Sequence, residues 1–541
     1  MSNFSEQSDG SSDLFGSTLT SPPTRLTKST SAATEFSSPQ TRVPKASTST
    51  PPKSSNGLDH HMMPESPLAL PTNVPFIISQ MQRMIDIKKL EKVKSRKYKQ
   101  DEFTDIFQAL DLDTKSLLYY HFPPLKFVKK PKKKPQIIDT IMGPYDPHFV
   151  DDAYTPWVYG RAISTYPHLP TRTIREGDPI CDSYCIQLLE DNMVITVVAD
   201  GCSWGKGPME ASNTAKSAFV DYLRSHLHEM NDLRDVGHYL LQALSACQFK
   251  ITEGKDQWEA GTTTLLGGVL IPVKKEKKEK KEGKKKEAQK SEKKEKKDKD
   301  KMKTWVWAFV TIGDCKSYHF NKESKAVTDL TEGNRQNVFD AKDCGGRLGP
   351  QVEEGAPDLR NVSLNFQLCS PGDIILILSD GVHDNLDPQT LGKVPADLGP
   401  KFSSVQDWND IESLDEVQNL KTQYMLKLLS EDLICGGQQE HKLRTKVFSI
   451  PTQQEEELMS PNSITTRIIQ FCLSMTGNGR EWMEQNPREK LPNDYIKYPG
   501  KMDHATCVTM KVGRFDVGVP RNRGGHDSRN PSTRNLKESS Y

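Results

Sequence analysis

Short runs of apolar, often β-branched residues that end in an aspartate constrain this chain more than any other feature. The run "MVITVVAD" covers 193–200, "WVWAFVTIGD" covers 305–314 and "IILILSD" covers 374–380. Runs of this length and composition are typical of strands that are buried on both faces. We therefore expect a core of sheets in which several strands end in a carboxylate.

Two apolar segments flank a strongly charged run and look like partners in one hairpin. Residues 262–273 and 304–313 each predict a strand, and a Lys- and Glu-rich sequence fills 274–303 between them. This low-complexity run favours a solvated, disordered insertion at the tip of the hairpin. Helical patterns occur at 207–230, 235–252, 420–437 and 460–475. Strands in hairpin-like succession with helices between them predict an α+β fold, in which antiparallel sheets are covered by helices.

Composition divides the 541 residues into segments. Residues 1–72 are rich in Ser, Thr and Pro and poor in aliphatic residues, so we expect a disordered tail. Residues 73–149 form a basic lead-in, and globular patterning runs from 150 to 515. Residues 516–541 are polar, and we expect a second disordered tail there.

The lead-in has two features of its own. Residues 76–98 place apolar side chains near helical spacing, which favours an amphipathic helix that docks on the main domain or on a partner. A basic cluster between prolines at 127–136 fits a nuclear address, an anion-binding loop or a plain solvated linker. The linker is the simplest of these interpretations.

Charge, hydropathy and cysteine spacing exclude several classes of protein. The net charge of +1 gives no general attraction to nucleic acid or to an anionic membrane. No apolar run reaches the roughly 18–20 residues needed to cross a bilayer, and the polar N-terminus is unlike a signal peptide. The ten cysteines lack the spacing of a disulfide framework or a zinc finger. We expect an intracellular chain, cytoplasmic or nuclear, with reduced thiols.

Aspartates stand at the ends of the strand candidates. They are Asp200 and Asp380, each followed by glycine, together with Asp314 and Asp503. Each alone is explained by turn chemistry, because Asp-Gly is a common way to leave a strand. If the strands lie side by side, the carboxylates converge and repel one another, and Mg²⁺ or Mn²⁺ would remove that repulsion. Two such ions can activate a shared water toward phosphorus, so both a turn role and a metal site remain open.

Five short motifs then occur in a familiar order. They are "ADGCSWG" (199–205), "GTTTLLGG" (261–268), "GDCKS" (313–317), "SDGVHD" (379–384) and "DHATCVTM" (503–510). In this order they resemble the metal-dependent protein phosphatases of the 2C type (PP2C), over about residues 175–512. The resemblance implies a central β-sandwich of two antiparallel sheets flanked by paired helices. It also implies two bound Mg²⁺ or Mn²⁺ ions, with a third, weaker site.

The same resemblance implies a ligand for each metal position. The ligands of the paired ions would be Asp200 as the bridge, the Gly201 carbonyl, Asp380 and Asp503. Asp314 and Asp384 match the acids of the third site.

The residues after the first aspartate depart from the family pattern. The family's histidine, a candidate general acid, is Cys202 here, and a thiol with an ordinary pKa of about 8.5 suits that role less well at neutral pH. The glycine pair that follows is replaced by Ser203 and Trp204. The tryptophan of the fourth motif is His383, for which a core or turn role is favoured over acid–base chemistry.

The phosphate-binding arginine of the family is matched only loosely. Arg175 is one candidate and Arg172 is a rival, and Asp182 lies in the same segment where the family has a Glu-Asp pair. Catalytic candidates are therefore Arg175, Arg172 and Cys202.

Two functions remain open from the sequence. The first is a Mg²⁺/Mn²⁺-dependent protein serine/threonine phosphatase that acts on a phosphoprotein through a metal-bridging water. The second is a weak or inactive pseudophosphatase that serves as an interaction or regulatory module for a protein partner. A nucleic-acid module built on the Lys-rich runs is disfavoured, because Glu and Asp are interleaved with the lysines. We expect a monomer.

Overall fold

The computed structural model describes residues 122–144, 156–170, 174–256, 259–274, 304–335, 344–350, 356–437 and 457–515. The two predicted tails, the helix expected at 76–98, Arg172 and nearly all of the charged insertion lie outside the described residues.

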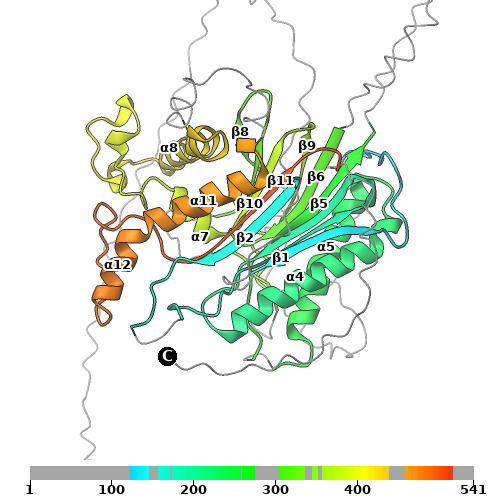
Figure 1. Ribbon diagram of the computed structural model, residues 1–541, viewed down its shortest axis with the longest axis horizontal. Helices are drawn as coiled ribbons and strands as arrows, with labels where there is room; N and C mark the ends of the chain where they lie inside the picture. The colour runs from blue at the N-terminus through cyan, green and yellow to red at the C-terminus, as the bar shows by residue number, and fades with distance from the viewer. Residues whose placement is uncertain are drawn as a thin grey trace, which may run out of the picture. The chain divides into compact units, whose positions relative to one another are not determined.

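Two antiparallel sheets form the centre of the described chain (Figure 1). The first has six strands in the order β1-β3-β4-β5-β6-β9, and the second has five in the order β2-β11-β10-β7-β8. The strands of the first sheet are β1 (Ile137–Gly143), β3 (Ser183–Leu189), β4 (Met193–Ala199), β5 (Leu265–Val273), β6 (Thr304–Ile312) and β9 (Ser363–Cys369). Those of the second are β2 (Val158–Ser164), β7 (Lys316–Phe320), β8 (Val327–Asp329), β10 (Ile374–Leu378) and β11 (His504–Lys511).

Paired helices cover the outer face of each sheet. α4 (Lys206–His226) and α5 (Leu233–Thr252) pack on the first sheet, whereas α11 (Pro461–Met475) packs on β2 and β11 of the second. α8 (Leu414–Lys427) continues into the π-helix η9 (Leu428–Ile434) beside α11, and α12 (Gly477–Gln485) follows α11. This arrangement confirms the expected α+β fold with two antiparallel sheets flanked by helices.

Short helical turns join these elements. They are η2 (Glu190–Asn192), η3 (Leu227–Glu229), α7 (Asp380–His383), η5 (Asp384–Leu386), η6 (Pro395–Asp397), η7 (Pro400–Phe402) and η8 (Trp408–Asp410). Side-chain caps fix two of the long helices, since Asp232 accepts from backbone N–H groups at the start of α5 and Ser460 does so at the start of α11.

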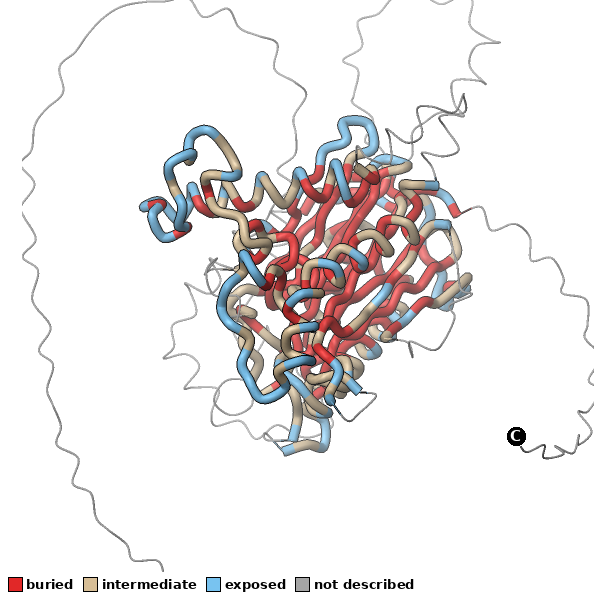
Figure 2. The backbone as a smooth tube through the Cα atoms, turned by 60° about the vertical axis from the view of Figure 1, so that its left-hand side comes forward, coloured by how far each residue is buried: buried red, intermediate tan, exposed pale blue. Residues whose placement is uncertain are grey.

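Apolar side chains fill the space between the sheets and beneath the helices. Trp305, Trp307 and Phe309 of β6 face Ile375, Ile377 and Val508 of the second sheet in one buried cluster. Separate clusters lie under α4 and α5 and under α11 and η9. Figure 2 shows the buried residues concentrated along the strands. A strand buried on both faces needs apolar residues at every position, which explains the continuous apolar runs.

The predicted hairpin around the charged insertion is present. β5 pairs with β6 in a single register from Leu265 opposite Ile312 to Val273 opposite Thr304. The turn after β9 behaves differently from a hairpin turn, because β9 pairs with β6 in the first sheet whereas β10 pairs with β7 and β11 in the second. That turn therefore carries the chain from one sheet to the other.

The folded region begins earlier than the boundary predicted at residue 150. β1 pairs with β3, and Phe122 and Phe127 are buried in the core beneath α4 and α5. The basic cluster at 127–136 is also packed onto the domain, because Lys129 pairs with Asp191 and Lys132 with Glu190. Both corrections have one cause: apolar residues spaced among lysines and prolines anchor a segment whose overall composition is that of a linker.

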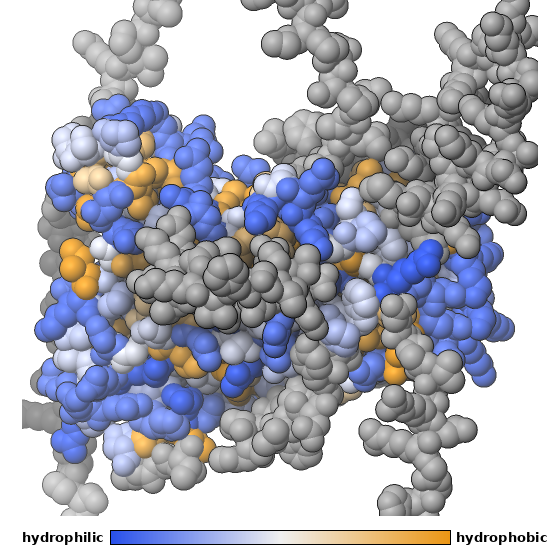
Figure 3. Space-filling view, turned by 45° about the horizontal axis from the view of Figure 1, so that its top comes forward, coloured by the Kyte–Doolittle hydropathy of each residue, from blue (hydrophilic) through white to orange (hydrophobic). Residues whose placement is uncertain are grey.

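Among the described residues that are visible in Figure 3, hydrophobic side chains appear in small groups among hydrophilic ones. None of the helices that the structure describes is long and apolar enough to span a membrane.

Candidate functional site

The predicted acids converge because antiparallel pairing brings the end of one strand beside the start of its partner. Ser183 pairs with Ala199, so Asp182 before β3 lies beside Asp200 after β4. In the second sheet, Ser379 donates its backbone N–H to the Thr506 carbonyl at 3.0 Å, which places Asp380 near Asp503. Residues from both sheets therefore meet at one end of the sandwich.

Asp314 occupies the crossing between the two sheets. It lies in the turn from β6 of the first sheet to β7 of the second. Gly313 in this turn has φ of +96°, and a Cβ there would overlap the Thr264 side chain. Only glycine suits both constraints, so the motif fixes the carboxylate of Asp314 between the sheets.

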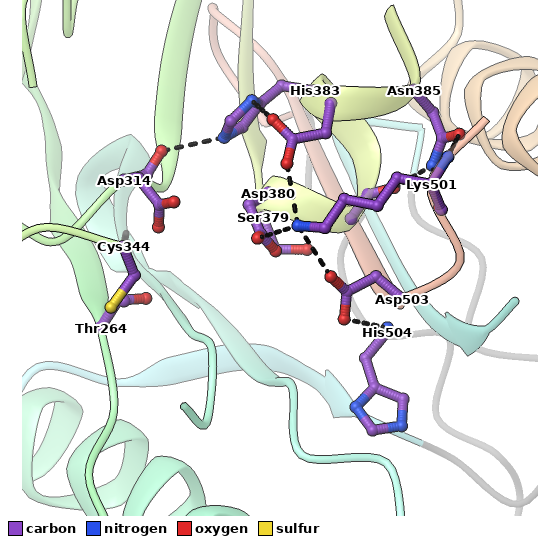
Figure 4. A network of polar contacts seen from close by, with 12 residues as sticks. Thr264, Asp314, Cys344, Ser379, Asp380, His383, Asn385, Lys501, Asp503 and His504 are labelled. Carbon is purple, nitrogen blue, oxygen red and sulfur yellow. Dashed lines mark hydrogen bonds and ion pairs between the residues drawn. The ribbon is translucent and has the colours of Figure 1, made fainter. Parts of the chain in front are cut away.

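Lys501 is the centre of the acid cluster. Its Nζ lies 2.7 Å from an Asp380 oxygen, 2.9 Å from an Asp384 oxygen and 3.0 Å from an Asp503 oxygen (Figure 4). The side chain is 22% exposed. One ammonium group thus neutralises part of the charge of three carboxylates.

Arg335 is a second internal cation. Its guanidinium contacts Asp314 at 2.6 Å and Asp384 at 2.7 Å. His383 also contacts both of these aspartates. Its Nε2 lies 3.0 Å from the Asp314 carbonyl oxygen, and its Nδ1 lies 3.2 Å from an Asp384 oxygen. His383 is buried among these contacts, which agrees with the core role favoured from the sequence.

The peptide segment before β11 is fixed on both sides. Thr165 Oγ1 accepts from the Asp503 N–H at 2.7 Å and donates to the Asp503 carbonyl at 2.8 Å. Asp503 Oδ1 accepts from Tyr166 Oη at 3.2 Å and from the His504 N–H at 2.9 Å. The carboxylate therefore has one oxygen turned to the backbone and the other turned to Lys501.

The two cations determine which carboxyls stay ionised. Burial is the largest influence and would raise the pKa of Asp380 and of Asp384, but the charges of Lys501, Arg335 and His383 together outweigh it and lower both. Burial would lower the pKa of Lys501, yet the three carboxylates hold it well above its usual value. Lys501 is therefore charged across the neutral range.

Asp182 and Asp200 lie on the other side of the cluster and are not among the carboxylates that Lys501 and Arg335 contact. Burial raises the pKa of Asp182 to about 6, with the hydroxyls of Thr506 and Ser379 offsetting part of the effect. Burial and the neighbouring Asp182 and Asp380 raise the pKa of Asp200 well above its usual value. Within the part of the chain that the structure describes, neither Asp182 oxygen makes a hydrogen bond of normal geometry, so the two nearby hydroxyls stabilise the carboxylate only weakly.

The pKa values of Asp503 and Asp314 are also raised. Burial, followed by the Asp380 charge, raises the pKa of Asp503 to about 7. Burial raises the pKa of Asp314 although Arg335 opposes it.

In this arrangement the acids do not fit a pair of metal ions. Among the described residues, no group of three or more His, Cys, Asp or Glu side chains is placed to hold a metal. Lys501 contacts Asp380 and Asp503, the oxygens that the resemblance assigns to a metal ion. The unpartnered oxygens of Asp182 mark the side of the cluster where positive charge is still lacking.

The other predicted site residues lie around this cluster. Gly201 packs against the carbonyl oxygens of Pro208 and Cys181, which explains the absence of a side chain there. The Sγ of Cys202 lies 3.8 Å from Cys344 Sγ. This contact is the larger cause, and burial the second, of a Cys202 thiol pKa well above its usual value. Arg175 donates from its guanidinium to the Tyr166 carbonyl at 2.6 Å.

Sequence reasoning missed the two cations. Lys501 stands two residues before Asp503, so a positive charge beside the last motif was the available signal. Arg335 lies 21 residues after Asp314 in a segment without pattern, and nothing local marked it.

Comparisons with known proteins bear on this arrangement. No family model matches the chain. A PP2C-like domain-containing protein of Drosophila melanogaster is 26% identical over an aligned length of 265 residues, and the match covers 45% of this chain and 33% of the relative. The match thus spans about a third of the length of that curated relative. It confirms the resemblance to PP2C-like proteins drawn from the five motifs, and the low identity agrees with wide divergence.

Solved structures give fold similarities at lower identity. The photosystem II phosphatase PBCP is 16% identical, with 66% of this chain and 98% of that chain covered and a TM-score of 0.29. A serine/threonine phosphatase of Mycobacterium tuberculosis, PstP/Ppp, is 14% identical, with 66% and 100% covered and a TM-score of 0.29. A catalytic domain of PstP in complex with two manganese ions is 13% identical, with 65% and 96% covered and a TM-score of 0.26.

Proposed function

We propose that this chain is a PP2C-like pseudophosphatase, a folded module that binds a protein partner and does not hydrolyse phosphoesters efficiently. One observation carries the proposal: the Lys501 ammonium lies within 3.0 Å of Asp380, Asp384 and Asp503. Two of these are the acids that the resemblance assigns to the paired ions.

A divalent ion would have to compete with this ammonium. A cation placed between the same oxygens would meet the Lys501 charge at short range, where Coulomb repulsion is strong in a buried site. Displacing Lys501 would also separate it from three carboxylates. The lysine therefore weakens metal binding on the side of Asp380 and Asp503.

The poor proton-donating ability of Cys202 also supports weak catalysis. Its raised pKa keeps the thiol protonated at neutral pH and makes it a weak proton donor to a leaving oxygen. A site with weakened metal binding and a weak proton donor is suited to binding more than to turnover.

Metal titration tests the proposal directly. We expect wild-type protein to bind Mn²⁺ weakly by isothermal titration calorimetry, and Lys501→Ala to bind it at least about tenfold more tightly because a competing charge is removed. Lys316→Ala is the matched control, since Lys316 pairs with Asp329 outside the acid cluster. Equal and tight Mn²⁺ binding by wild-type protein and Lys501→Ala would overturn the proposal.

A second candidate function is Mg²⁺- or Mn²⁺-dependent hydrolysis of phosphoserine or phosphothreonine in a protein substrate. The uncompensated side of the cluster favours it, because Asp182 has unpartnered oxygens and Asp200 carries a raised pKa. The test is Mn²⁺-dependent release of phosphate from a phosphopeptide, compared with Asp200→Asn and Asp380→Asn. Wild-type activity well above both variants would favour this function over the first.

We further propose that the partner is a phosphoprotein or another protein and that the chain acts as a monomer. All ten cysteines are thiols, which is typical of a reducing compartment and supports a cytoplasmic or nuclear location.

A further inference from the structure

Cys202 and Cys344 form a close thiol pair beside the acid cluster. Their sulfurs are 3.8 Å apart, and both residues are partly exposed, whereas all but one of the other cysteines are buried. The pair is 142 residues apart in sequence, so the fold alone brings the thiols together.

Backbone hydrogen bonds fix Cys202. Its N–H donates to the Thr262 carbonyl at 2.9 Å, and the preceding Gly201 forms a bridge with Thr263. Thr263 in turn exchanges hydrogen bonds with Leu348, at 3.0 and 2.8 Å. The segment that carries Cys202 is therefore connected through Thr263 to the segment that carries Cys344.

The residues after Cys344 are fixed in a similar way. Gly345 accepts from the Arg360 guanidinium at 2.9 Å, and the Gly346 N–H donates to Asn361 Oδ1 at 2.9 Å. Both cysteines thus project from anchored backbone. A disulfide has an S–S bond of about 2.0 Å, so each sulfur has to move only about 1 Å.

We propose that Cys202 and Cys344 are an oxidant-responsive pair that closes into an intramolecular disulfide. The modification site links the loop after β4 to the segment 344–350. This inference needs neither metal binding nor phosphoester hydrolysis, so it stands apart from the proposed function.

The chemistry balances with hydrogen peroxide as the oxidant. One of the two cysteines, as its thiolate, attacks one peroxide oxygen, the O–O bond breaks, and the leaving hydroxide takes a proton to become water. The resulting sulfenic acid is then attacked by the sulfur of the other cysteine, the S–O bond breaks, and a second water leaves. Two thiols are oxidised by two electrons and one peroxide is reduced to two waters.

Peroxide treatment of the full chain tests the inference. After titration with hydrogen peroxide, remaining thiols are alkylated, and disulfide-linked peptides are identified by mass spectrometry without reduction. We expect a linked peptide containing Cys202 and Cys344, formed within one chain and reversed by dithiothreitol. Cys435→Ser is the matched control, because Cys435 is also partly exposed, and it should leave the link intact.

A single variant tests whether the link needs both thiols. In Cys202→Ser, we expect no linked peptide, and a dimedone probe should label the sulfenic acid that peroxide leaves at Cys344. If a variant fails to fold, the wild-type peptide map still decides the matter. Alkylatable Cys202 and Cys344 at a peroxide concentration that oxidises Cys435 would overturn the inference, and so would a link between two chains.

Discussion

The side chain of Asn385 binds the backbone of Lys501 through both of its polar ends. Its Nδ2 donates to the Lys501 carbonyl at 2.8 Å, and its Oδ1 accepts from the Lys501 N–H at 2.9 Å. The same Nδ2 donates to the Gly381 carbonyl at 2.7 Å. An internal amide thus sets the position of the lysine relative to the turn that carries Asp380.

Removing this amide should destabilise the protein. Asn385→Ala leaves the backbone groups of Lys501 and Gly381 without their partner, and Asn385 is fully buried. We expect a loss of about 2–4 kcal/mol in the free energy of unfolding, because each buried unsatisfied group costs about 1–3 kcal/mol. Urea unfolding measures it. Asn409→Ala, on the exposed surface, should change stability little, and equal effects of the two variants would contradict the prediction.

Arg335 should be costly to remove because Asp314 loses its ion-pair partner and Asp384 loses one partner while keeping Lys501. Arg335→Met abolishes the contacts with Asp314 and Asp384, whose side chains are 1% and 5% exposed. Breaking a buried ion pair from one side costs about 3–5 kcal/mol, and we expect a loss of that size by urea unfolding.

Arg360→Met serves as the control for Arg335. Arg360 pairs with Asp358 at 3.2 Å, and its side chain is 41% exposed. The screened pair should contribute much less. A loss under about 1 kcal/mol for Arg335→Met would show that the acids are not charged as described.

The local part of the site was open to prediction from sequence. Strand endings, Asp-Gly turns and apolar runs are encoded within a few residues, so Asp200, Asp314, Asp380 and Asp503 could be placed at strand ends. Their convergence followed from antiparallel pairing. The role of each acid is still a prediction, because placement alone does not define a ligand.

Features that depend on residues far apart in the sequence could not be predicted in the same way. The turn between β9 and β10 has the composition of a hairpin turn, yet the strands belong to different sheets. That choice depends on which apolar faces meet in the core, and no local residue pattern records it. Arg335 and Lys501 lie in irregular segments, where one charge among many gives no sign of its partner.

A buried aspartate away from the site gives a pH-dependent prediction. Asp373 accepts hydrogen bonds from His319 Nε2 at 2.9 Å, from the Ser370 N–H at 2.8 Å and from the Lys322 N–H at 3.0 Å. Burial alone would raise its pKa, but these hydrogen bonds outweigh burial and lower it.

The sign of the pH effect follows from the lowered pKa. A carboxyl whose pKa is lower in the folded state stabilises the fold above the unfolded pKa of about 3.9, and this contribution disappears as pH falls through the folded pKa. Asp373→Asn should therefore cost about 1–3 kcal/mol at pH 7, and the difference from wild type should shrink below about pH 4. Urea unfolding across pH 3.5–7 checks this, and a penalty that grows toward acid would contradict it.

Gly381 should be intolerant of any side chain, because α7 begins directly against β11. A Cβ at this position would overlap the His504 carbonyl oxygen and press on the Asp503 side chain. The His504 carbonyl and the Asp503 Cβ belong to the peptide segment at the start of β11. They therefore cannot move aside as the end of a flexible side chain could. Gly381→Ala must therefore shift α7 away from β11, at a cost of about 1–3 kcal/mol.

This shift has a specific consequence for Lys501. Asp380 would move with α7 while Asp503 stays with β11, so one ammonium could no longer lie within 3.0 Å of both. We expect Lys501 in Gly381→Ala to react faster with an amine-modifying reagent than in wild-type protein, as read by peptide mass spectrometry. Gly399→Ala is the control, since a Cβ at Gly399 meets nothing within 4 Å. Unchanged Lys501 reactivity in a destabilised Gly381→Ala would mean that the lysine follows Asp380 and does not depend on the joint position of the two acids.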